Sequence, residues 1–503
     1  MVTAGRVLGR LAGSQYEQNE VRRANLWESL RRHVTGNLLF PASNYLLNRR
    51  HILGTYRRSR QAQWYAQEQL REIQLVKLRQ LLHYAQTSVP FYRQRFAQLG
   101  LRAEDIHSLE DLRHIPPLSR GDVIEHGKEM VDECWASSVA AAEQRPPSSL
   151  GAPISFARFK KHKLVKCSSS GSSGEPVVYY EHGSKSAVSW AFELLLKSWH
   201  DIDPGMTESR FVRLSKDYLP NSATARLRRM MWRQWILPGL SLSAREYDAC
   251  LSAMLKFRPH VLWGFVSAMT GLAEYIRENR ISLRSYRPDL IVGWAEPTYD
   301  HQQQLLTDVF QCRVTSLYSC HEVGHIAAQC PAGRFHVNQE HLLVETEPAL
   351  LQEPASQLGE VLVTSLYETP MPFIRYRLGD VAELGTHSCP CGRNLQTLSN
   401  LAGRSSEIFT TKRGRMVAPN FWCHLLRREP QGSFIRQFQV VYRKDGGIRL
   451  NLIAHNGLPE ATESHLRNLI AQGLEGETNV EFAYVAEIPR LSSGKAQLVV
   501  REA

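Results

Sequence analysis

The chain has 503 residues, 43% of them hydrophobic and 22% charged, and its formal net charge is +12. A length of this order predicts roughly two to four folded units, and the hydrophobic fraction excludes a wholly disordered chain. The 9 cysteines are an odd number scattered over a long chain, which argues against a small domain held together by disulfides.

The positive charge predicts attraction to anions, but it does not choose between nucleotides, coenzymes and anionic surfaces. An arginine-rich stretch at 49–60 is better explained as a solvated helix face than as a membrane or polyanion patch. No run reaches the roughly 20 apolar residues of a spanning helix. The first residues also lack the apolar core of a secretory signal. We therefore expect a cytoplasmic protein without a transmembrane segment and without a nucleic-acid partner.

The predicted elements change character along the chain. Residues 1–115 have a polar, helical pattern, in which Leu75, Leu78, Leu82 and Ala85 recur at spacings of three and four. From about residue 160 onwards, short apolar runs alternate with helical patterns, which favours an α/β domain with buried strands. The strands predicted in this part are 176–180, 260–265, 289–294, 314–319, 342–347 and 360–367, with a long helix near 185–200.

A separate pattern begins at residue 404. Strands are predicted at 434–443 and 448–455 around a Gly-Gly turn, followed by a helix near 460–473, a strand at 479–485 and an exposed tail. The expected fold class is α/β, with a large domain at 116–403 and a small, mobile α+β domain at 404–503. The helical N-terminal region, 1–115, is expected to pack on the large domain as a cap.

The stretch 168-SSSGSSGEPVVYY-180 places hydroxyls and glycines ahead of a β-like run. A phosphate-binding loop of the Walker type has a lysine and then a helix at the place where this chain has Glu175 and a run of β-branched and aromatic residues. The pattern instead predicts strand, loop, strand, in which serine hydroxyls and backbone amides can hold an anion. A flexible Ser/Gly linker is the alternative that composition alone leaves open.

Further stretches follow this loop in order, and they carry a resemblance to a known family. They are 293-GWAEP-297, 318-YSCHEVG-324, 375-RYRLGD-380, 403-GRSSEIF-409 and, near the end, 493-SGK-495. Together with the loop they resemble the motifs of the adenylate-forming acyl ligase superfamily. The nearest branch looks like phenylacetate-CoA ligase and its relatives, which include adenylating enzymes associated with capsule synthesis. The stretches 83-HYAQTSVPFYRQRF-96 and 116-PPLSRGDV-123 are also similar to this branch.

The resemblance implies an AMP-forming carboxylate ligase that uses ATP and Mg²⁺. A carboxylate attacks the α-phosphate, pyrophosphate leaves, and a second nucleophile takes the acyl group from the adenylate. Coenzyme A is the acceptor that the family suggests first, and an amine or hydroxyl is the alternative. The acid is not predicted, although Trp263, Gly264 and Phe265 resemble the region that shapes its pocket. The family also suggests a homodimer.

The resemblance assigns roles to individual residues. Lys495 bridges the attacking carboxylate and the α-phosphate, Glu322 holds Mg²⁺, and Arg404 reaches the ribose or the phosphates. Asp380 accepts hydrogen bonds from the ribose, and Tyr318 stacks on or beside the purine. The other nucleotide-binding positions implied are Ser169, Ser170, Gly171, Ser172, Ser173 and Gly174 in the loop, Ala295, Glu296 and Pro297 at the adenine, and His321 before the metal-binding glutamate.

Three positions depart from the family pattern. Glu175 replaces a loop lysine, His321 replaces a threonine and Ser319 replaces a glycine. A catalytically degenerate nucleotide-binding protein is therefore the alternative from another functional class. A phosphotransferase ranks behind both, because the sequence lacks a Walker motif. The small domain is expected to rotate about a hinge at Ser406, where the family usually has an aspartate.

Cys330 and His336, followed by Cys389 and Cys391, supply three thiols and one imidazole. This set suits a closed, tetrahedral Zn²⁺ site, and the Cys-Pro-Cys turn presents two sulfurs together. Relatives of phenylacetate-CoA ligase carry a similar set. We expect a structural zinc that ties two nucleotide-contacting segments together, with free thiols as the alternative. Spare ligand candidates nearby are His341 and His387.

Overall fold

The computed structural model describes most of the chain between residues 34 and 502. The described ranges are 34–42, 50–144, 164–169, 177–212, 223–239, 243–283, 286–348, 358–385, 388–410, 416–417, 419–427, 434–454, 457–474, 476, 479–489 and 498–502. None of the helices in these ranges has the length and apolar composition that crossing a bilayer requires. The predicted loop residues 170–174, and Lys495, lie outside the described residues.

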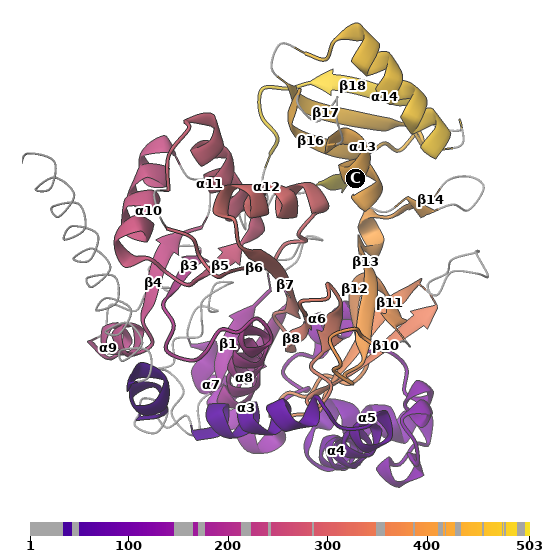
Figure 1. Ribbon diagram of the computed structural model, residues 1–503. Helices are drawn as coiled ribbons and strands as arrows, with labels where there is room; N and C mark the ends of the chain where they lie inside the picture. Colours follow the sequence, from indigo (N-terminus) through magenta and orange to yellow (C-terminus); the bar gives the residue numbers. More distant parts are fainter. Residues whose placement is uncertain are drawn as a thin grey trace, which may run out of the picture.

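Helices of the N-terminal part pack beneath the main body (Figure 1). The predicted apolar stripe is confirmed at Leu78, Leu82 and Ala85, which are each 0% exposed, whereas Leu75 is only half-buried. Pro90 then starts a new helix, where its missing N–H group costs no hydrogen bond. The helices of this part are α3 (Arg50–Ala62), α4 (Gln67–Ser88) and α5 (Pro90–Leu99), with short helical turns η1 (Thr35–Leu39), η2 (Ala103–Asp105) and η3 (Glu110–His114). They are followed in the large domain by α6 (Arg120–His126), the short turn η4 (Glu133–Trp135) and α7 (Ala136–Glu143).

A mixed sheet runs through the large domain, and its described part has 11 strands in the order β10-β11-β12-β13-β9-β8-β7-β6-β5-β3-β4. The strands of the parallel half are β3 (Glu208–Val212), β4 (Gln234–Pro238), β5 (Val261–Phe265), β6 (Leu290–Trp294) and β7 (Arg313–Cys320). The strands of the antiparallel half are β8 (Gly324–Gln329), β9 (Phe335–Val337), β10 (Leu342–Pro348), β11 (Leu358–Ser365), β12 (Tyr376–Gly385) and β13 (Thr397–Arg404).

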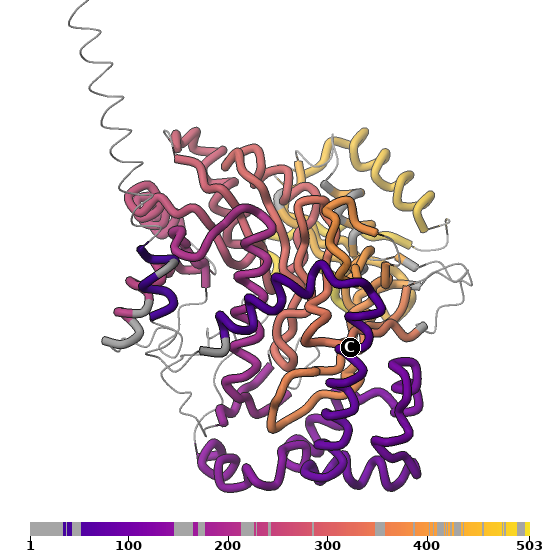
Figure 2. Tube along the Cα trace, turned by 60° about the horizontal axis from the view of Figure 1, so that its bottom comes forward, coloured from indigo at the N-terminus to yellow at the C-terminus, as the bar shows by residue number. Residues whose placement is uncertain are grey.

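Helices cover both faces of the parallel half. One face packs against α8 (Gly183–Trp199), and Figures 1 and 2 both show α3 running along this helix. The other face packs against α10 (Ala244–Phe257), α11 (Val266–Glu278) and α12 (Asp300–Phe310), while α9 (Ala223–Met231) lies beside β4 at the edge. Because both faces are buried, these strands are continuous apolar runs in the sequence rather than alternating ones.

A small α+β domain follows β13, which confirms the expected fold class. Its sheet has the order β18-β17-β16-β19, and its core includes Trp422, Leu450 and Leu466, each 0% exposed. Tyr299 of the large domain packs against this core. The elements are η6 (Ser405–Glu407), β14 (Phe409–Thr410), β15 (Met416–Val417), α13 (Pro419–Arg427), β16 (Ile435–Tyr442), β17 (Ile448–Ala454), α14 (Glu460–Gly473), β18 (Val480–Tyr484) and β19 (Val499–Arg501).

Candidate active site

Two short antiparallel strands flank the serine-rich stretch. These strands are β1 (Val165–Ser168) and β2 (Val178–Glu181), which confirms the two predicted strands, and residues 170–176 between them lie outside the described residues. Ser169 is 6% exposed, and its hydroxyl accepts a 3.0 Å hydrogen bond from the amide of Val177. This hydroxyl therefore closes the base of the loop. A phosphate-binding role for Ser169 and for 170–174 stays a prediction.

Three of the predicted nucleotide-binding residues meet across β7, β12 and β13. The hydroxyl of Tyr318 donates to Asp380 Oδ2 at 2.7 Å, and Arg404 Nε lies 3.6 Å from Asp380 Oδ1. Asp380 and Arg404 are direct partners in the strand register, and Gly379, with φ of 74°, allows the turn before them. Burial, and then Asp380, raise the pKa of Tyr318, so the hydroxyl stays protonated at neutral pH. An acidic group is thus held between a hydroxyl donor and a cation.

Glu322, the predicted Mg²⁺ ligand, lies in the turn between β7 and β8 and is 8% exposed. Its Oε1 accepts a 3.2 Å hydrogen bond from the hydroxyl of Tyr376, at the start of β12. Burial, followed by Glu322, raises the pKa of Tyr376, which keeps this donor protonated. Carboxylate oxygens are the ligands that Mg²⁺ prefers in proteins, so the residue fits the predicted ion.

Lys185, in the first turn of α8, is a site residue that the sequence did not reveal. Its ammonium lies 2.8 Å from Glu181 Oε2, at the end of β2, and also donates to the backbone carbonyl of His321. Lys185 is 7% exposed and Glu181 is 4% exposed. Close packing continues at Gly324, where a Cβ would lie 2.6 Å from Ser189 Oγ. Lys185 therefore joins the hairpin that carries the loop to the turn that carries the metal-binding glutamate.

Ala295, Glu296 and Pro297 follow the carboxyl end of β6. Ala295 has a φ of 66°, which marks a sharp turn. The carboxylate of Glu296 accepts hydrogen bonds of 2.8 Å from the amide and 3.0 Å from the hydroxyl of Ser267, at the start of α11. A negative charge is favourable at a helix N-terminus. Glu296 thus fixes α11 to the turn after β6, and contact of this segment with adenine stays a prediction.

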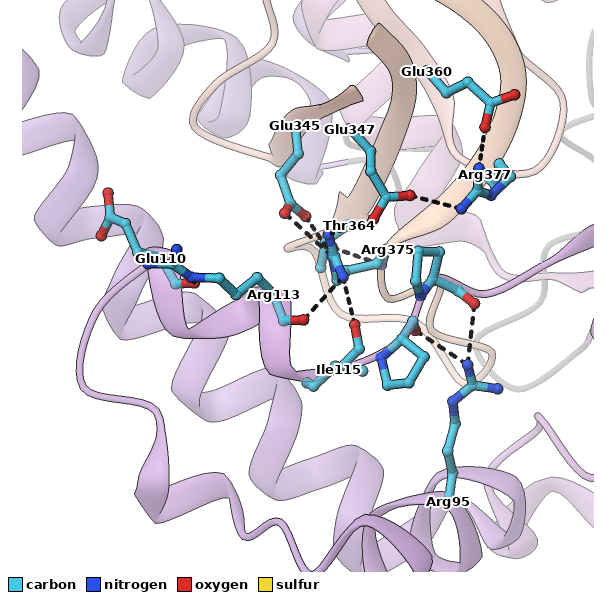
Figure 3. A network of polar contacts seen from close by, with 12 residues as sticks. Arg95, Glu110, Arg113, Ile115, Glu345, Glu347, Glu360, Thr364, Arg375 and Arg377 are labelled. Atoms are coloured by element: carbon cyan, nitrogen blue, oxygen red, sulfur yellow. Dashed lines mark hydrogen bonds and ion pairs between the residues drawn. The ribbon is translucent and has the colours of Figure 1, made fainter. Parts of the chain in front are cut away.

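Arg375 directly precedes β12, the strand that carries Asp380, and Figure 3 shows its contacts. It is 5% exposed and has a φ of 52°. Its Nε lies 3.2 Å from both carboxylate oxygens of Glu345, and its Nη1 donates to the carbonyl of Ile115 at 2.6 Å. These contacts fix the strand of Asp380 to the segment that precedes Pro116, so the N-terminal region supports the site.

The four predicted zinc ligands come together. The ligand atoms of Cys330, His336, Cys389 and Cys391 all lie within 4.8 Å of one another. The sulfurs of Cys330 and Cys389 are 3.6 Å apart, and His336 Nε2 is 3.2 Å from the sulfur of Cys391. His336 Nδ1 donates to the carbonyl of Leu395 at 3.1 Å, which leaves Nε2 as the metal-binding nitrogen.

These distances fit tetrahedral zinc, in which two sulfurs at about 2.3 Å from the ion are roughly 3.8 Å apart. His336 is 0% exposed, and its ring lies 5.7 Å from that of Trp199. The spare candidate His341 lies elsewhere, 3.5 Å from the hydroxyl of Ser59, and His387 is outside the described residues. Four protein ligands in a buried set are typical of a structural rather than a catalytic zinc site.

Comparisons with known proteins identify what this chain is similar to. A family model described as the CapK C-terminal domain matches residues 409–502. The chain is 24% identical to Protein CapK of Staphylococcus aureus, over 68% of this chain and 75% of that protein. It is also 24% identical to a phenylacetate-coenzyme A ligase of Thermus thermophilus, over 76% of this chain and 80% of that protein.

A solved structure of a similar fold is a 2-hydroxyisobutyryl-CoA ligase in the postadenylation state. It superposes with a TM-score of 0.65 at 18% identity and covers 87% of this chain and 91% of that one. This likeness concerns the fold. The matched relatives and the matched C-terminal domain support placing the chain with the adenylate-forming acyl ligases, in the branch of CapK and the phenylacetate-CoA ligases.

Proposed function

We propose that this protein activates a carboxylic acid with ATP, forming an acyl adenylate and pyrophosphate, and then transfers the acyl group to coenzyme A. The observation that carries the proposal is the meeting of Tyr318, Asp380 and Arg404 next to the turn of Glu322. This site lies at the carboxyl end of the parallel strands, where open α/β sheets bind their ligands. The phenylacetate-coenzyme A ligase among the relatives supports the choice of acceptor.

In the first step, a carboxylate oxygen of the acid attacks the α-phosphorus of ATP. The bond from this phosphorus to the bridging oxygen breaks, and pyrophosphate leaves with the electron pair. Asp380 accepts hydrogen bonds from the ribose hydroxyls, and Arg404 holds Asp380 in place and adds positive charge. Glu322 would hold Mg²⁺, which offsets phosphate charge when it is bound. Fixed orientation and compensated charge both lower the barrier of such a step.

In the second step, the sulfur of coenzyme A attacks the acyl carbon, the thiol proton passes to solvent, and AMP leaves with the carboxylate oxygen. We propose that Lys495 brings its ammonium to the carboxylate and the α-phosphate in the first step. The predicted domain at 404–503 would then move between the steps relative to the body formed by 1–115 and 116–403. A lid that rotates in this way exposes the adenylate to the second substrate.

We also propose that Cys330, His336, Cys389 and Cys391 bind one structural Zn²⁺. The ion would join the end of β8 to the segment that leads into β13, and this segment borders the strand of Arg404. The protein is further proposed to act in the cytoplasm, where ATP and coenzyme A are supplied, and its predicted homodimer can be measured by analytical ultracentrifugation.

A second candidate acceptor is an amine or a hydroxyl, which would give an amide or ester ligase. The family model that matches residues 409–502 is named for CapK rather than for a coenzyme A ligase, and the small domain helps to form the acceptor site in a lid mechanism. Product analysis with and without coenzyme A distinguishes the two acceptors, since only the thioester requires the coenzyme.

Exchange of labelled pyrophosphate into ATP, measured over a panel of carboxylic acids, tests the first step. We expect exchange that depends on the acid and on Mg²⁺ and that is lost in Lys495→Ala. Lys444→Ala is the matched control, because Lys444 lies exposed in a turn of the same domain. Binding of ATP without exchange for any acid would instead support a degenerate nucleotide-binding protein.

A further inference from the structure

Five charged or titratable side chains lie buried between α8 and the sheet, and we call them the α8 charge cluster. Arg210 pairs with Glu193 at 2.5 Å and with Glu208 at 2.6 Å, and Lys197 pairs with Glu208 at 2.6 Å. The fifth member is His325 on β8. Each of these side chains is 10% exposed or less. The two carboxylates and the two permanent cations balance one another, which leaves His325 as the additional polar group.

The protonation of Glu193 determines how the ring of His325 is used. Burial acts to raise the pKa of Glu193, but Arg210 and His325 outweigh it, and the pKa falls to about 2. Glu193 is therefore ionised at neutral pH and can only accept hydrogen bonds. His325 Nε2 lies 3.2 Å from Glu193 Oε1, so Nε2 carries a hydrogen and donates it. In the neutral ring, the other nitrogen, Nδ1, is then an acceptor.

His325 Nδ1 is buried, and it has no hydrogen-bond partner in the described part of the chain. Within the same ranges, Nε1 of Trp294 at the end of β6 is also buried without an acceptor. Unpaired buried polar atoms are costly, and native proteins keep few of them. At the edge of a candidate active site, a polar group of a bound ligand can pair with such buried atoms and so explain why they are kept.

Both side chains lie near the edge that carries the nucleotide site. His325 is three residues from Glu322 and pairs across the strands with Ser319, next to a register shift at Tyr318 and Ser319. Successive side chains of a strand point to opposite faces, so Ser319 and His325 lie on the face opposite to Tyr318. Trp294 is partly buried and packs against the hydrophobic cluster to which apolar side chains of α8 belong. A ligand on this face would therefore meet the nucleotide from the α8 side.

We infer that His325 Nδ1 binds a polar group of the acid, so that the preferred substrates are hydroxy-substituted carboxylic acids rather than plain hydrocarbon acids. This inference rests on the proposed function and specifies its substrate class. A hydroxyl can donate a hydrogen bond to the imidazole nitrogen. An acid without such a group leaves a buried nitrogen unpaired, and sites of this kind reject it.

Pyrophosphate exchange with matched acids tests the inference on the wild-type protein. The pairs are phenylacetate and 4-hydroxyphenylacetate, benzoate and 3-hydroxybenzoate, and butyrate and 3-hydroxybutyrate. We expect at least one hydroxylated acid to exceed its twin in kcat/KM by about tenfold or more, which is the effect of one buried hydrogen bond. Hydrocarbon acids that equal or exceed their twins in every pair would overturn the inference.

Two substitutions of His325 separate the roles of its two nitrogens. Asparagine places an amide near the position of Nδ1, whereas glutamine places it near Nε2 and keeps the contact with Glu193. We expect His325→Gln to lower the preference for the hydroxylated acid about 10- to 100-fold without changing the KM for ATP. His325→Asn should keep more of this preference, which a purely structural histidine would not predict.

His200→Gln is the matched control. His200 is 2% exposed, its Nε2 lies 3.0 Å from the carbonyl of Gln329 at the other end of β8, and its Nδ1 also has no partner among the described residues. We expect this variant to keep the wild-type preference. An equal loss in His200→Gln and His325→Gln, or no loss in His325→Gln, would contradict the inference.

The results also separate this inference from the proposed function. If no acid supports exchange, the proposed function fails and the substrate class fails with it. If hydrocarbon and hydroxylated acids exchange equally well, the function stands and only the substrate class is wrong. Should the His325 variants not fold, the wild-type ratios decide the question alone.

Discussion

Replacing Lys185 with methionine would remove the cation that joins the loop hairpin to the turn of Glu322. Methionine keeps most of the aliphatic chain, so little packing is lost. The carboxylate of Glu181, however, would stay buried at 4% exposure without its cation, and the carbonyl of His321 would lose a donor. Breaking a buried ion pair by removing one partner costs about 3–5 kcal/mol. We expect the free energy of unfolding to fall by about this amount.

The double variant Glu181→Gln, Lys185→Met is the control, because it removes both charges together. Replacing a whole buried pair is often nearly neutral, so we expect the double variant to lose less than about 2 kcal/mol. Urea titration followed by tryptophan fluorescence measures both values. Equal losses in the single and double variants would refute the role of Lys185 as a buried bridge.

The same substitution should also weaken nucleotide use. The turn that carries Glu322 is held from α8 by Lys185, and small displacements of a positioned group cost about 10- to 100-fold in rate. We expect Lys185→Met to raise the KM for Mg-ATP in the exchange assay while the KM for the acid changes little. Equal changes in both KM values would indicate a general loss of structure rather than a displaced turn.

Three further predictions concern Asp380, the cysteine cluster and pH. Tyr318→Phe removes the 2.7 Å donor to Asp380 and should raise the KM for ATP about tenfold in steady-state titrations; an unchanged KM would contradict this role. The purified protein should hold one zinc by elemental analysis, and Cys391→Ser should lose the zinc and lower the Tm. A wild-type protein that contains no metal and has the same Tm as Cys391→Ser would exclude the site. Burial lowers the pKa of His341 to about 4 from 6.5, so the unfolded state binds the proton first as the pH falls. The free energy of unfolding should therefore decrease by up to about 3 kcal/mol between pH 6.5 and pH 4. In His341→Gln, the free energy of unfolding should depend less on pH over this range. If the variant shows the same dependence as the wild-type protein, other groups cause it.

The sequence predicted the strands that position the site because these strands are buried on both faces. The predicted ranges 260–265 and 289–294 differ from Val261–Phe265 and Leu290–Trp294 by one residue at the start. The cysteine cluster was also predictable, although Cys330 and Cys389 are 59 residues apart, because few other arrangements use three thiols and an imidazole.

The polar groups that support the site were not predictable in the same way. Lys185, Arg210 and Arg375 are residue types that usually lie in solvent, yet each is less than 10% exposed because a carboxylate from another element pairs with it. Such pairs depend on tertiary contacts, as between Arg375 and Glu345, and they leave no periodic signal in the sequence. For the same reason, the unpaired Nδ1 of His325 can be identified only when the positions of α8 and β8 are known.

Labelling the acid with oxygen-18 tests the central claim most directly, namely that a carboxylate oxygen attacks the α-phosphorus of ATP. The acid with the highest exchange activity is labelled in its carboxylate, incubated with ATP and coenzyme A, and the products are analysed by mass spectrometry. The proposed reaction predicts that each AMP carries one labelled oxygen and that pyrophosphate carries none. Unlabelled AMP, or ADP as the nucleotide product, would contradict it.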